Sequence, residues 1–356
     1  MAGRHSELAR LGWTEWFEER ALCLPGEAPA RVAAVDRGLL LLVDQTGTFR
    51  AKLSGSYLHR HGLSQEVPCV GDWVGVARQP TDTSGVIHTL LERRTALRRK
   101  SAGDSVAYQM IAANVDHVMV VQSCHHDFNL KRLERYLVMV KDGGADPCVL
   151  LTKTDLVEPD VLASQRAAIR AAGVASPVLA LSNVTRQGID DLERMLLPAR
   201  TYCFVGSSGV GKSTIINRLI GRERQQTGSV SGTGAGRHTT VRRELILLEN
   251  GALVIDNPGM RELGILGAES GLGGSFSDIA ELAARCRYRN CGHAGEPGCA
   301  VVEAVGSGAV GREHYESFIR LREESEFNEL TNAEKRRKDR NFGKYIKTAK
   351  DSLRKR

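Results

Sequence analysis

The chain has 356 residues and a mass of 38.8 kDa, which predicts two or three domains rather than one. Hydrophobic residues make up 42% and charged residues 26% of the sequence, a balance that excludes disordered, collagen-like and fibrous chains. The longest apolar runs fall far short of the roughly 18 residues that cross a bilayer, and the first thirty residues lack the pattern of a signal peptide. We therefore expect a soluble, cytoplasmic protein with no membrane partner.

The positive charge is concentrated at one end of the chain. The net charge is +7, but residues 335–356 contain eleven Lys or Arg and two Asp, so this tail carries +9 and the rest of the chain carries −2. A localised basic segment suggests a polyanionic partner that is bound by counterion release. The alternative is the solvated end of a helix.

Short strands separated by turns predict a small β-barrel near the N-terminus. The expected strands are residues 31–35, 39–43, 48–53 and 72–77, and the spacing leaves room for a fifth. An OB-type barrel would suit an oligonucleotide, but the pattern does not distinguish it from an SH3-like barrel. Five basic residues close this segment, and they indicate either RNA contact or a solvated linker: Arg93, Arg94, Arg98, Arg99 and Lys100.

From residue 114 onward the pattern changes to strands that alternate with helices, which predicts a parallel α/β sheet. The expected strands are 115–121, 147–151, 177–181 and 201–205, and the expected helices are 130–140, 161–172, 189–197 and 212–220. Two more apolar runs, 245–248 and 253–255, flank the turn Glu249-Asn250-Gly251 as an antiparallel pair would. Beyond residue 267 the sequence predicts an irregular glycine-rich segment and then helices, including one over 313–329.

A phosphate-binding loop is the strongest chemical signal in the sequence. Its residues form G-x-x-x-x-G-K-S between an expected strand and an expected helix: Gly206, Ser207, Ser208, Gly209, Val210, Gly211, Lys212 and Ser213. Glycines let backbone N–H groups turn inward around phosphates, and the helix N-terminus adds its positive end. Lys212 would reach the β- and γ-phosphates, and the Ser213 hydroxyl would bind Mg²⁺. The alternative is a chance glycine-rich turn.

Other motifs favour guanine over adenine as the base. Thr152-Lys153-Thr154-Asp155 is typical of the guanine-reading motif, because the Asp155 carboxylate can accept hydrogen bonds from guanine N1 and N2. Thr152 stands where asparagine is common, and we expect the loss of a bracing amide to weaken base binding. Ser182 and Asn183 follow the next strand and fit the loop that contacts guanine O6.

The second switch of a GTPase is predicted at Asp256-Asn257-Pro258-Gly259, where Asp256 would hold Mg²⁺ through water and the Gly259 N–H would sense the γ-phosphate. The base motifs precede the phosphate loop, whereas in a Ras-like domain they follow it. The domain is therefore interpreted as circularly permuted. This order places both switch regions last, next to the C-terminal module, so that hydrolysis could move that module directly.

The first switch is expected in the Gly/Ser/Thr-rich stretch 227–240, where Thr239 or Thr240 would complete the Mg²⁺ shell. Met260 stands where many GTPases carry a glutamine that orients the attacking water. A thioether cannot orient water, so we expect slow intrinsic turnover, with His238 or a partner group in that role. His238 is equally interpreted as an exposed loop residue or an RNA contact.

Four residues within a short stretch predict a structural zinc site: Cys286, Cys291, His293 and Cys299. Three thiolates and one imidazole form a closed tetrahedral shell. A redox pair or inert thiols are the alternatives. The five other cysteines are scattered in apolar stretches and are predicted to be buried free thiols: Cys23, Cys69, Cys124, Cys148 and Cys203.

Together these features resemble the bacterial ribosome small-subunit-dependent GTPases, a circularly permuted family. The motifs that carry the resemblance are 206–214, 236–240, 256–259, the Cys/His cluster with Glu296-Pro297-Gly298, and Ile111-Ala112-Ala113-Asn114-Val115-Asp116. The resemblance extends the phosphate-binding residues to Thr214. It implies an OB domain, a central GTPase, a zinc domain, and GTP hydrolysis stimulated by the small subunit late in its maturation.

We therefore predict an N-terminal extension (1–30), an OB-fold RNA-binding domain (31–103), a circularly permuted P-loop GTPase domain (111–267) and an α-helical zinc domain with a basic tail (275–356). The predicted function is that of a monomeric GTP hydrolase that binds the small ribosomal subunit and its rRNA and is released on hydrolysis. Its cofactors would be one structural Zn²⁺ and the Mg²⁺ that accompanies GTP. The alternatives are an RNA-binding protein that only senses GTP, and an ATP-dependent enzyme such as a nucleoside kinase.

Overall fold

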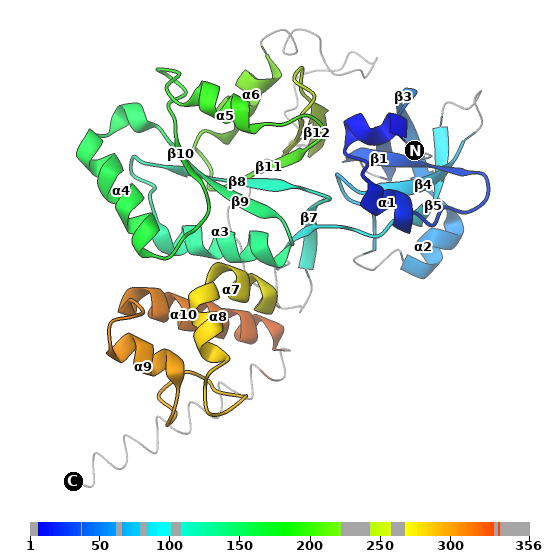
Figure 1. The fold of residues 1–356 in the computed structure, drawn as a ribbon. Coiled ribbons are helices and arrows are strands. Elements are labelled where there is room, and N and C mark those ends of the chain that lie inside the picture. Colours follow the sequence, from blue (N-terminus) through cyan, green and yellow to red (C-terminus); the bar gives the residue numbers. More distant parts are fainter. Residues whose placement is uncertain are drawn as a thin grey trace.

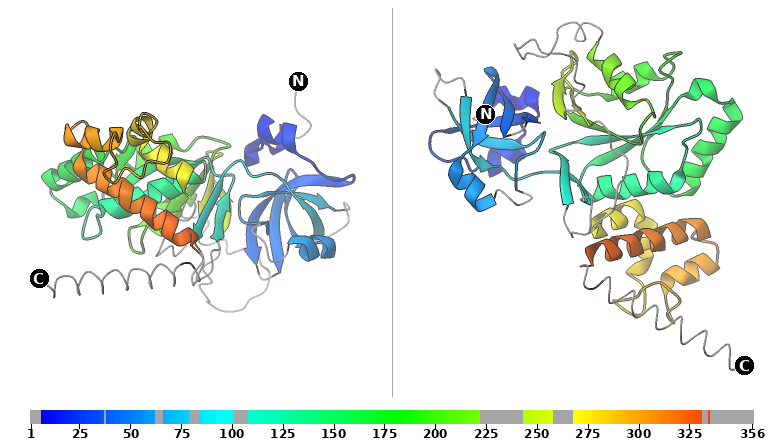
Figure 2. Two further views of the ribbon diagram at one scale, coloured as in Figure 1. Left: turned by 90° about the horizontal axis from the view of Figure 1, so that it is seen from below. Right: turned by 180° about the vertical axis from the view of Figure 1, so that it is seen from behind.

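The computed structural model describes residues 6–36, 38–61, 66–78, 84–100, 108–221, 243–257, 268–330 and 334. Within them the chain forms an N-terminal barrel, a central α/β domain and a C-terminal helical module (Figure 1). The barrel lies beside the central sheet, and the helical module lies against helix α3, as the views from below and behind also show (Figure 2). The basic tail falls outside the described residues.

The barrel has five strands, as predicted: β1 (Glu27–Asp36), β2 (Leu39–Asp44), β3 (Gly47–Leu53), β4 (Trp73–Ala77) and β5 (Ser84–Leu90). Strand β1 pairs with both β2 and β4, and the order β1-β2-β3-β5-β4 closes the barrel. Helix α2 (Gly55–His61) follows β3. Alternating side chains such as Val32, Leu42 and Ile87 fill the interior. The first strand begins four residues before the predicted one because its early half already pairs with β4.

The segment before the barrel is packed into the fold rather than free. A short 3-10 helix, η1 (Ser6–Leu11), and helix α1 (Glu15–Arg20) precede β1. Trp13 and Phe17 are buried and lie against Trp73 of the barrel, with ring centroids 4.8 and 6.0 Å from that of Trp73. Aromatic side chains of this size supply much of the apolar area in a core. Residues 6–20 therefore pack against the outside of the barrel interior, in a core cluster that continues into the central domain.

The central sheet has the predicted parallel core. Its strands lie in the order β10 (Val178–Ala180), β9 (Asp146–Thr152), β8 (His117–Ser123), β11 (Thr201–Val205), β13 (Leu253–Asp256) and β12 (Glu244–Leu247). All neighbours are parallel except β12 and β13, which form the expected antiparallel pair. These strands are apolar almost throughout because helices cover both faces of the sheet.

Helices α3 (Leu130–Asp142) and α4 (Pro159–Ala171) pack on one face of the sheet, and α5 (Ile189–Met195) and α6 (Lys212–Ile220) pack on the other. A short 3-10 helix, η2 (Thr154–Leu156), follows β9. The N-terminus of α3 is capped by the Asn129 side chain, which accepts a hydrogen bond from the Arg132 N–H at 2.9 Å. The parallel α/β prediction is thus confirmed element by element.

The C-terminal module contains α7 (Glu269–Ser275), α8 (Ser277–Ala283), α9 (Ala300–Gly306) and α10 (Arg312–Glu329). It is fixed to α3. Gly271 of α7 allows a close approach to α3, since a Cβ atom there would lie 2.2 Å from the Val138 carbonyl oxygen. Glu324 accepts a bidentate pair from Arg135, with its shortest distance 2.7 Å, and buried Glu134 accepts from the Ser317 hydroxyl at 2.8 Å.

A hairpin of β6 (Ala96–Lys100) and β7 (Tyr108–Ala113) connects the barrel to the central sheet. The basic residues of this region, for which the sequence left RNA contact and a solvated linker open, each contact a partner within the chain. The partners are Asp72 for Arg93, Asp116 for Arg94, Asp142 for Arg98, Gln109 for Arg99 and Asn328 for Lys100. Three of these contacts join different parts of the chain, since Arg94 and Arg98 reach the central domain and Lys100 reaches α10.

One buried arginine holds the barrel, the N-terminal segment and the central domain together. Arg31 of β1 is 1% exposed, and its guanidinium donates hydrogen bonds to the carbonyl oxygens of Leu11, Gly71 at 3.2 Å and Asn114 at 2.9 Å. Burial lowers the pKa of Arg31 to about 10, so it remains charged at neutral pH. The guanidinium also lies 5.6 Å from the centre of the Trp73 ring.

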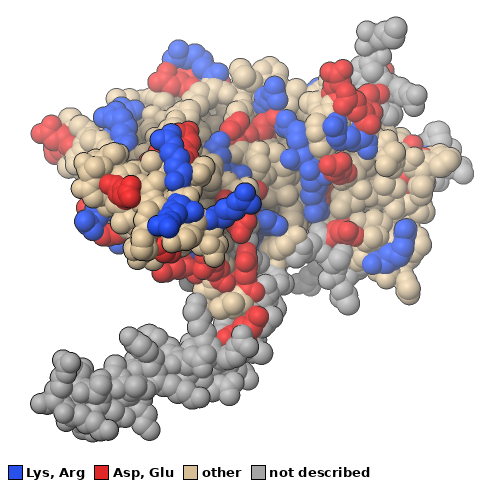
Figure 3. Space-filling model, turned by 60° about the horizontal axis from the view of Figure 1, so that its bottom comes forward, with Lys and Arg blue, Asp and Glu red and all other residues tan. Residues whose placement is uncertain are grey.

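Charged side chains of both signs are interspersed on the face seen from below (Figure 3). This mixture fits the small negative charge of residues 1–334 and leaves the tail sequence as the main excess of positive charge. Among the described residues, no helix combines the length and the apolar character that crossing a membrane requires.

Replacing Arg31 by methionine should strongly destabilise the protein, because it would leave three buried carbonyl groups without their donor. We expect the free energy of unfolding of the first transition in urea to fall by at least about 3 kcal/mol. Exposed Arg50 of β3 provides a control, for which Arg50→Met should change it by less than about 0.5 kcal/mol. Equal effects of the two substitutions would contradict the assigned role of Arg31.

Candidate nucleotide and metal sites

The phosphate-loop sequence lies at the carboxyl end of β11 and opens α6. Gly206 has φ +145°, and a Cβ there would lie 2.2 Å from the Val121 carbonyl oxygen, so a side chain is excluded where the loop passes β8. Gly211 precedes the first turn of α6. Val210 is buried, whereas Ser208, Gly209 and Ser213 are exposed around the loop. The exposed part of the loop is thus the part that would face a phosphate.

The Lys212 ammonium is bound by the loop itself in this structure. It donates to the carbonyl oxygens of Gly206 at 2.7 Å and Ser207 at 2.5 Å, and the side chain is largely buried. Burial lowers the pKa of Lys212, and the nearby Asp256 carboxylate opposes this shift. Burial likewise raises the pKa of Asp256 while Lys212 opposes the rise. Lys212 lies in the phosphate-loop motif after β11, and Asp256 ends the neighbouring strand β13.

The guanine motif joins the phosphate loop through Thr152. This residue is fully buried at the end of β9, and its hydroxyl lies 2.6 Å from the Val210 carbonyl oxygen and 3.2 Å from that of Gln122. The threonine hydroxyl thus contacts the phosphate loop in place of an asparagine amide, and weaker base binding stays a prediction. Lys153 has φ 58°, a left-handed conformation that turns the chain sharply after the strand.

The next loop supports the exposed carboxylate of Asp155. Buried Ser182 donates its hydroxyl to Asp155 Oδ1 at 2.5 Å and accepts from the N–H groups of Val184 and Thr185 at 3.1 and 3.0 Å. The Asn183 carbonyl accepts from Arg218 of α6 at 2.8 Å, and its side-chain amide lies beside Gly211. Asn183 Oδ1 is buried without a hydrogen-bond partner among the described residues.

The structure brings residues 152–155, 182–183, 206–214 and 256 to the same end of one sheet, although the first two sets precede the phosphate loop in the sequence. The predicted switch residues His238, Thr239, Thr240 and Gly259 lie outside the described residues. Sequence reasoning missed Arg218, which holds the Asn183 loop, since nothing near a single arginine in a helix indicates a partner 35 residues away.

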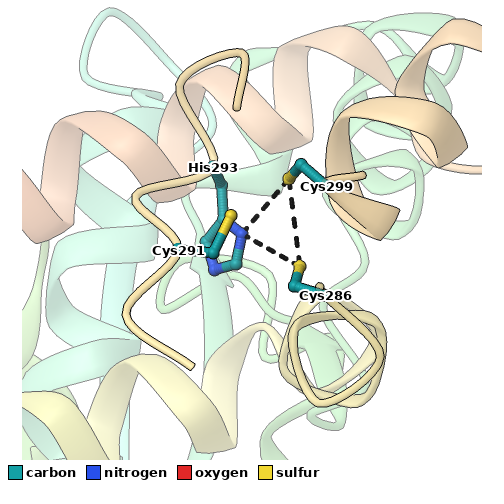
Figure 4. A group of neighbouring side chains, drawn as sticks. All are labelled: Cys286, Cys291, His293 and Cys299. Atoms are coloured by element: carbon teal, nitrogen blue, oxygen red, sulfur yellow. Dashed lines mark hydrogen bonds between the residues drawn. The ribbon is translucent and has the colours of Figure 1, made fainter. Parts of the chain in front are cut away.

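The four metal-ligand candidates also converge, as Figure 4 shows. Their ligand atoms all lie within 4.8 Å of one another. His293 Nδ1 is 3.6 Å from Cys286 Sγ and 3.4 Å from Cys299 Sγ, and the latter two sulfurs are 3.9 Å apart. Tetrahedral zinc with ordinary bond lengths would give about 3.6 Å for nitrogen–sulfur and about 3.8 Å for sulfur–sulfur pairs. The residues fit such an ion.

Neighbouring side chains fix the loop that carries two of these ligands. Glu296 accepts from the N–H groups of Gly292 and Ala294, each at 2.7 Å. From α10, Tyr315 donates to the His293 carbonyl at 2.5 Å and Arg322 donates to that of Gly292 at 2.6 Å. The other five cysteines are free thiols as predicted, and all except the partly exposed Cys23 are buried.

The chain is similar over most of its length to known GTPases. A profile of the RsgA GTPase family matches residues 90–266. The small ribosomal subunit biogenesis GTPase RsgA of Opitutus terrae is 41% identical over 332 residues, which cover 90% of each chain. A second RsgA, from Listeria monocytogenes, is 39% identical over 92% of this chain and 91% of its own.

Two crystal structures share the fold. YloQ, described as a circularly permuted GTPase, superposes with a TM-score of 0.60 at 25% identity and covers 83% of this chain and 94% of its own. YjeQ from Thermotoga maritima gives a TM-score of 0.62 at 24% identity over 83% of this chain and 97% of its own. The permuted order of motifs in the sequence thus has a structural counterpart.

Replacing Thr152 by valine should weaken guanine-nucleotide binding, because the Val210 carbonyl would lose its hydroxyl donor without a change in side-chain size. We expect the affinity for a fluorescent GDP analogue to fall roughly fivefold, the equivalent of about 1 kcal/mol. Thr185→Val, at an exposed position of the neighbouring loop, should leave the affinity unchanged. Unchanged binding by the Thr152 variant would show that the contact does not support the site.

Proposed function

Because the chain belongs to the RsgA family of small ribosomal subunit biogenesis GTPases, we propose that it hydrolyses GTP on the small ribosomal subunit and leaves that particle after hydrolysis. The chain is a GTP hydrolase with a circularly permuted nucleotide domain. The observation that carries the proposal is the convergence of the base motif and the phosphate loop at one sheet edge, in a chain that is 41% identical to a named relative. Family membership also argues against a nucleoside kinase.

Specific residues are proposed for each part of the nucleotide. Thr152, Lys153, Asp155, Ser182 and Asn183 would bind guanine, and the backbone of residues 206–214 would surround the phosphates. When phosphate arrives, Lys212 would exchange the two loop carbonyls for phosphate oxygens. Mg²⁺ would neutralise charge on the phosphates, held by Ser213, by Asp256 and by Thr239 or Thr240. Gly259 would sense the γ-phosphate, and His238 or a group donated by the partner would orient water.

The flanking modules are proposed to bind ribosomal RNA, with the barrel as an OB-type RNA-binding domain and the basic tail as an electrostatic contact. We also propose the domain division given above, a monomeric state and a cytoplasmic location, where ribosomal subunits mature. The mixed charge on the described face in Figure 3 supports a role for the tail in attracting a polyanion.

The Cys/His cluster is proposed to hold one structural zinc ion through Cys286, Cys291, His293 and Cys299. All four positions of a tetrahedral shell would be filled by protein, so the ion would stabilise the loop rather than take part in hydrolysis. The distances among the ligand atoms and the backbone contacts of Glu296, Tyr315 and Arg322 support this assignment.

Small ribosomal subunits should stimulate GTP turnover by more than about tenfold, because partner groups can supply the water orientation that Met260 cannot. Lys212→Ala should abolish both basal and stimulated turnover, whereas Lys131→Ala, at an exposed lysine of α3, should retain both. Phosphate release measured with and without purified subunits tests this expectation. A GTP turnover rate that is the same with and without subunits would contradict the proposal. If no GTP is hydrolysed even in a single-turnover experiment with subunits, the result would favour an RNA-binding protein that only senses GTP.

Zinc analysis of the purified protein by mass spectrometry should find about one ion per chain. Cys299→Ser removes a ligand and should lower the bound zinc by more than about fivefold, while Cys148→Ser replaces a buried thiol of β9 and should not. A zinc-free wild-type protein, or equal loss in the two variants, would rule the assignment out.

A further inference from the structure

Arg243 occupies a junction that the nucleotide-binding motifs do not include. It directly precedes β12, the strand whose first residue, Glu244, pairs with Ala34 of the barrel strand β1 and also with Asp256 of β13. Through these pairings the central sheet and the barrel form one continuous sheet of eleven strands. Strand β12, which follows Arg243, therefore lies between barrel strand β1 and strand β13, and β13 ends at Asp256.

The Arg243 guanidinium connects two segments that are far apart in the sequence. Its Nε donates to Asn257 Oδ1 at 2.8 Å, and its Nη1 donates to the Met110 carbonyl oxygen at 3.1 Å. Asn257 is 1% exposed and directly follows Asp256 at the end of β13, so its position depends on that of Asp256. Met110 belongs to β7. A planar guanidinium with a fixed arrangement of donors sets the distance between two such acceptors more strictly than an ammonium does.

The β6–β7 hairpin that accepts from Arg243 contacts all three parts of the chain. Its last residue, Ala113, donates its N–H to the Val70 carbonyl of the barrel at 3.0 Å. Arg98 of β6 pairs with Asp142 of α3, and Lys100 donates to Asn328 in the last turn of α10 at 2.9 Å. A displacement of this hairpin would therefore disturb its contacts with the barrel and with the C-terminal module at the same time.

We infer that Arg243 is a positioning residue that couples the end of β13, at Asp256 and Asn257, to the β6–β7 hairpin. When a change of bound nucleotide shifts Asp256, Asn257 next to it shifts as well, and Arg243 transmits the change to β7 and so to both flanking modules. Because such coupling is reciprocal, a partner that binds the hairpin and holds it in one position also favours one position of Asp256. The inference deepens the proposed function, on which it rests for the identity of the nucleotide site and of the partner.

Hydrogen exchange of the isolated full-length chain tests the coupling without ribosomes. Amides of residues 108–116 should exchange at rates that differ by more than about threefold between the GDP complex and the complex with a non-hydrolysable GTP analogue. Arg243→Ala should remove this difference while changing the affinity for a fluorescent GDP analogue by less than about twofold. Arg243→Lys keeps the positive charge but loses the planar group whose two nitrogens reach Asn257 and Met110. This variant should therefore retain only part of the wild-type difference in exchange rate.

The matched control is Arg194→Ala, which removes a surface arginine of α5 and should leave the wild-type difference intact. If Arg243→Ala does not fold, Asn257→Ala removes the same contact from its other side and should give the same loss. The inference would be overturned if residues 108–116 of the wild type exchange at the same rate in both nucleotide complexes. It would also be overturned if the difference persists in both Arg243→Ala and Asn257→Ala. Failure of subunits to stimulate turnover would instead count against the proposed function, because the exchange experiment contains no subunits.

Discussion

The architecture depends on one buried cation that is surrounded by carbonyl oxygens. Arg31 donates to Leu11, Gly71 and Asn114, which belong to the N-terminal segment, the barrel and the entry to the central domain. A buried guanidinium is costly unless its donors are satisfied, and here only the assembled arrangement of the three segments satisfies them. Asn114 strengthens the joint, since its side-chain amide donates to the Gly71 carbonyl at 3.1 Å and its Oδ1 accepts from the Arg94 N–H at 2.9 Å.

This joint has a consequence for the nucleotide site. The permuted order of motifs predicts that both switches adjoin the C-terminal module, but the structure also connects the strand that ends at Asp256 to the barrel through β12. Strand β12 pairs with β1, and β13 carries Asp256 at its end. Arg31 lies on β1, the barrel strand that pairs with β12, so the same strand makes both the buried joint and the connection to the central sheet. The GTPase domain is therefore connected to both of its neighbours rather than to one.

Local patterns in the sequence were sufficient to predict much of the fold and the site. The G-x-x-x-x-G-K-S loop, the strand and helix periods from residue 114, and the Cys/His spacing each lie within short stretches, and the structure places them as expected. Short-range spacing is informative because strand and helix geometry converts it directly into position.

The contacts that the sequence could not predict are those between distant segments. Arg31 and Asn114 are 83 residues apart, and Thr152 and Val210 are 58 apart. The sequence around Arg93 is compatible with an RNA contact or a solvated linker, because the charge of an arginine does not indicate whether its ion-pair partner lies in the same chain. Similarly, the hydroxyl of Thr152 makes a contact that its residue type did not suggest.

We propose that segments in circularly permuted order, including Asp155 and the phosphate loop, together bind guanine nucleotides. The most direct measurement is nucleotide competition with Asp155→Asn, which exchanges an acceptor for a donor at the base edge. The wild type should prefer guanine over adenine nucleotides, and the variant should shift its preference toward xanthine nucleotides by more than about tenfold. A variant that keeps the guanine preference, or a wild type that binds ATP as well as GTP, would contradict the account.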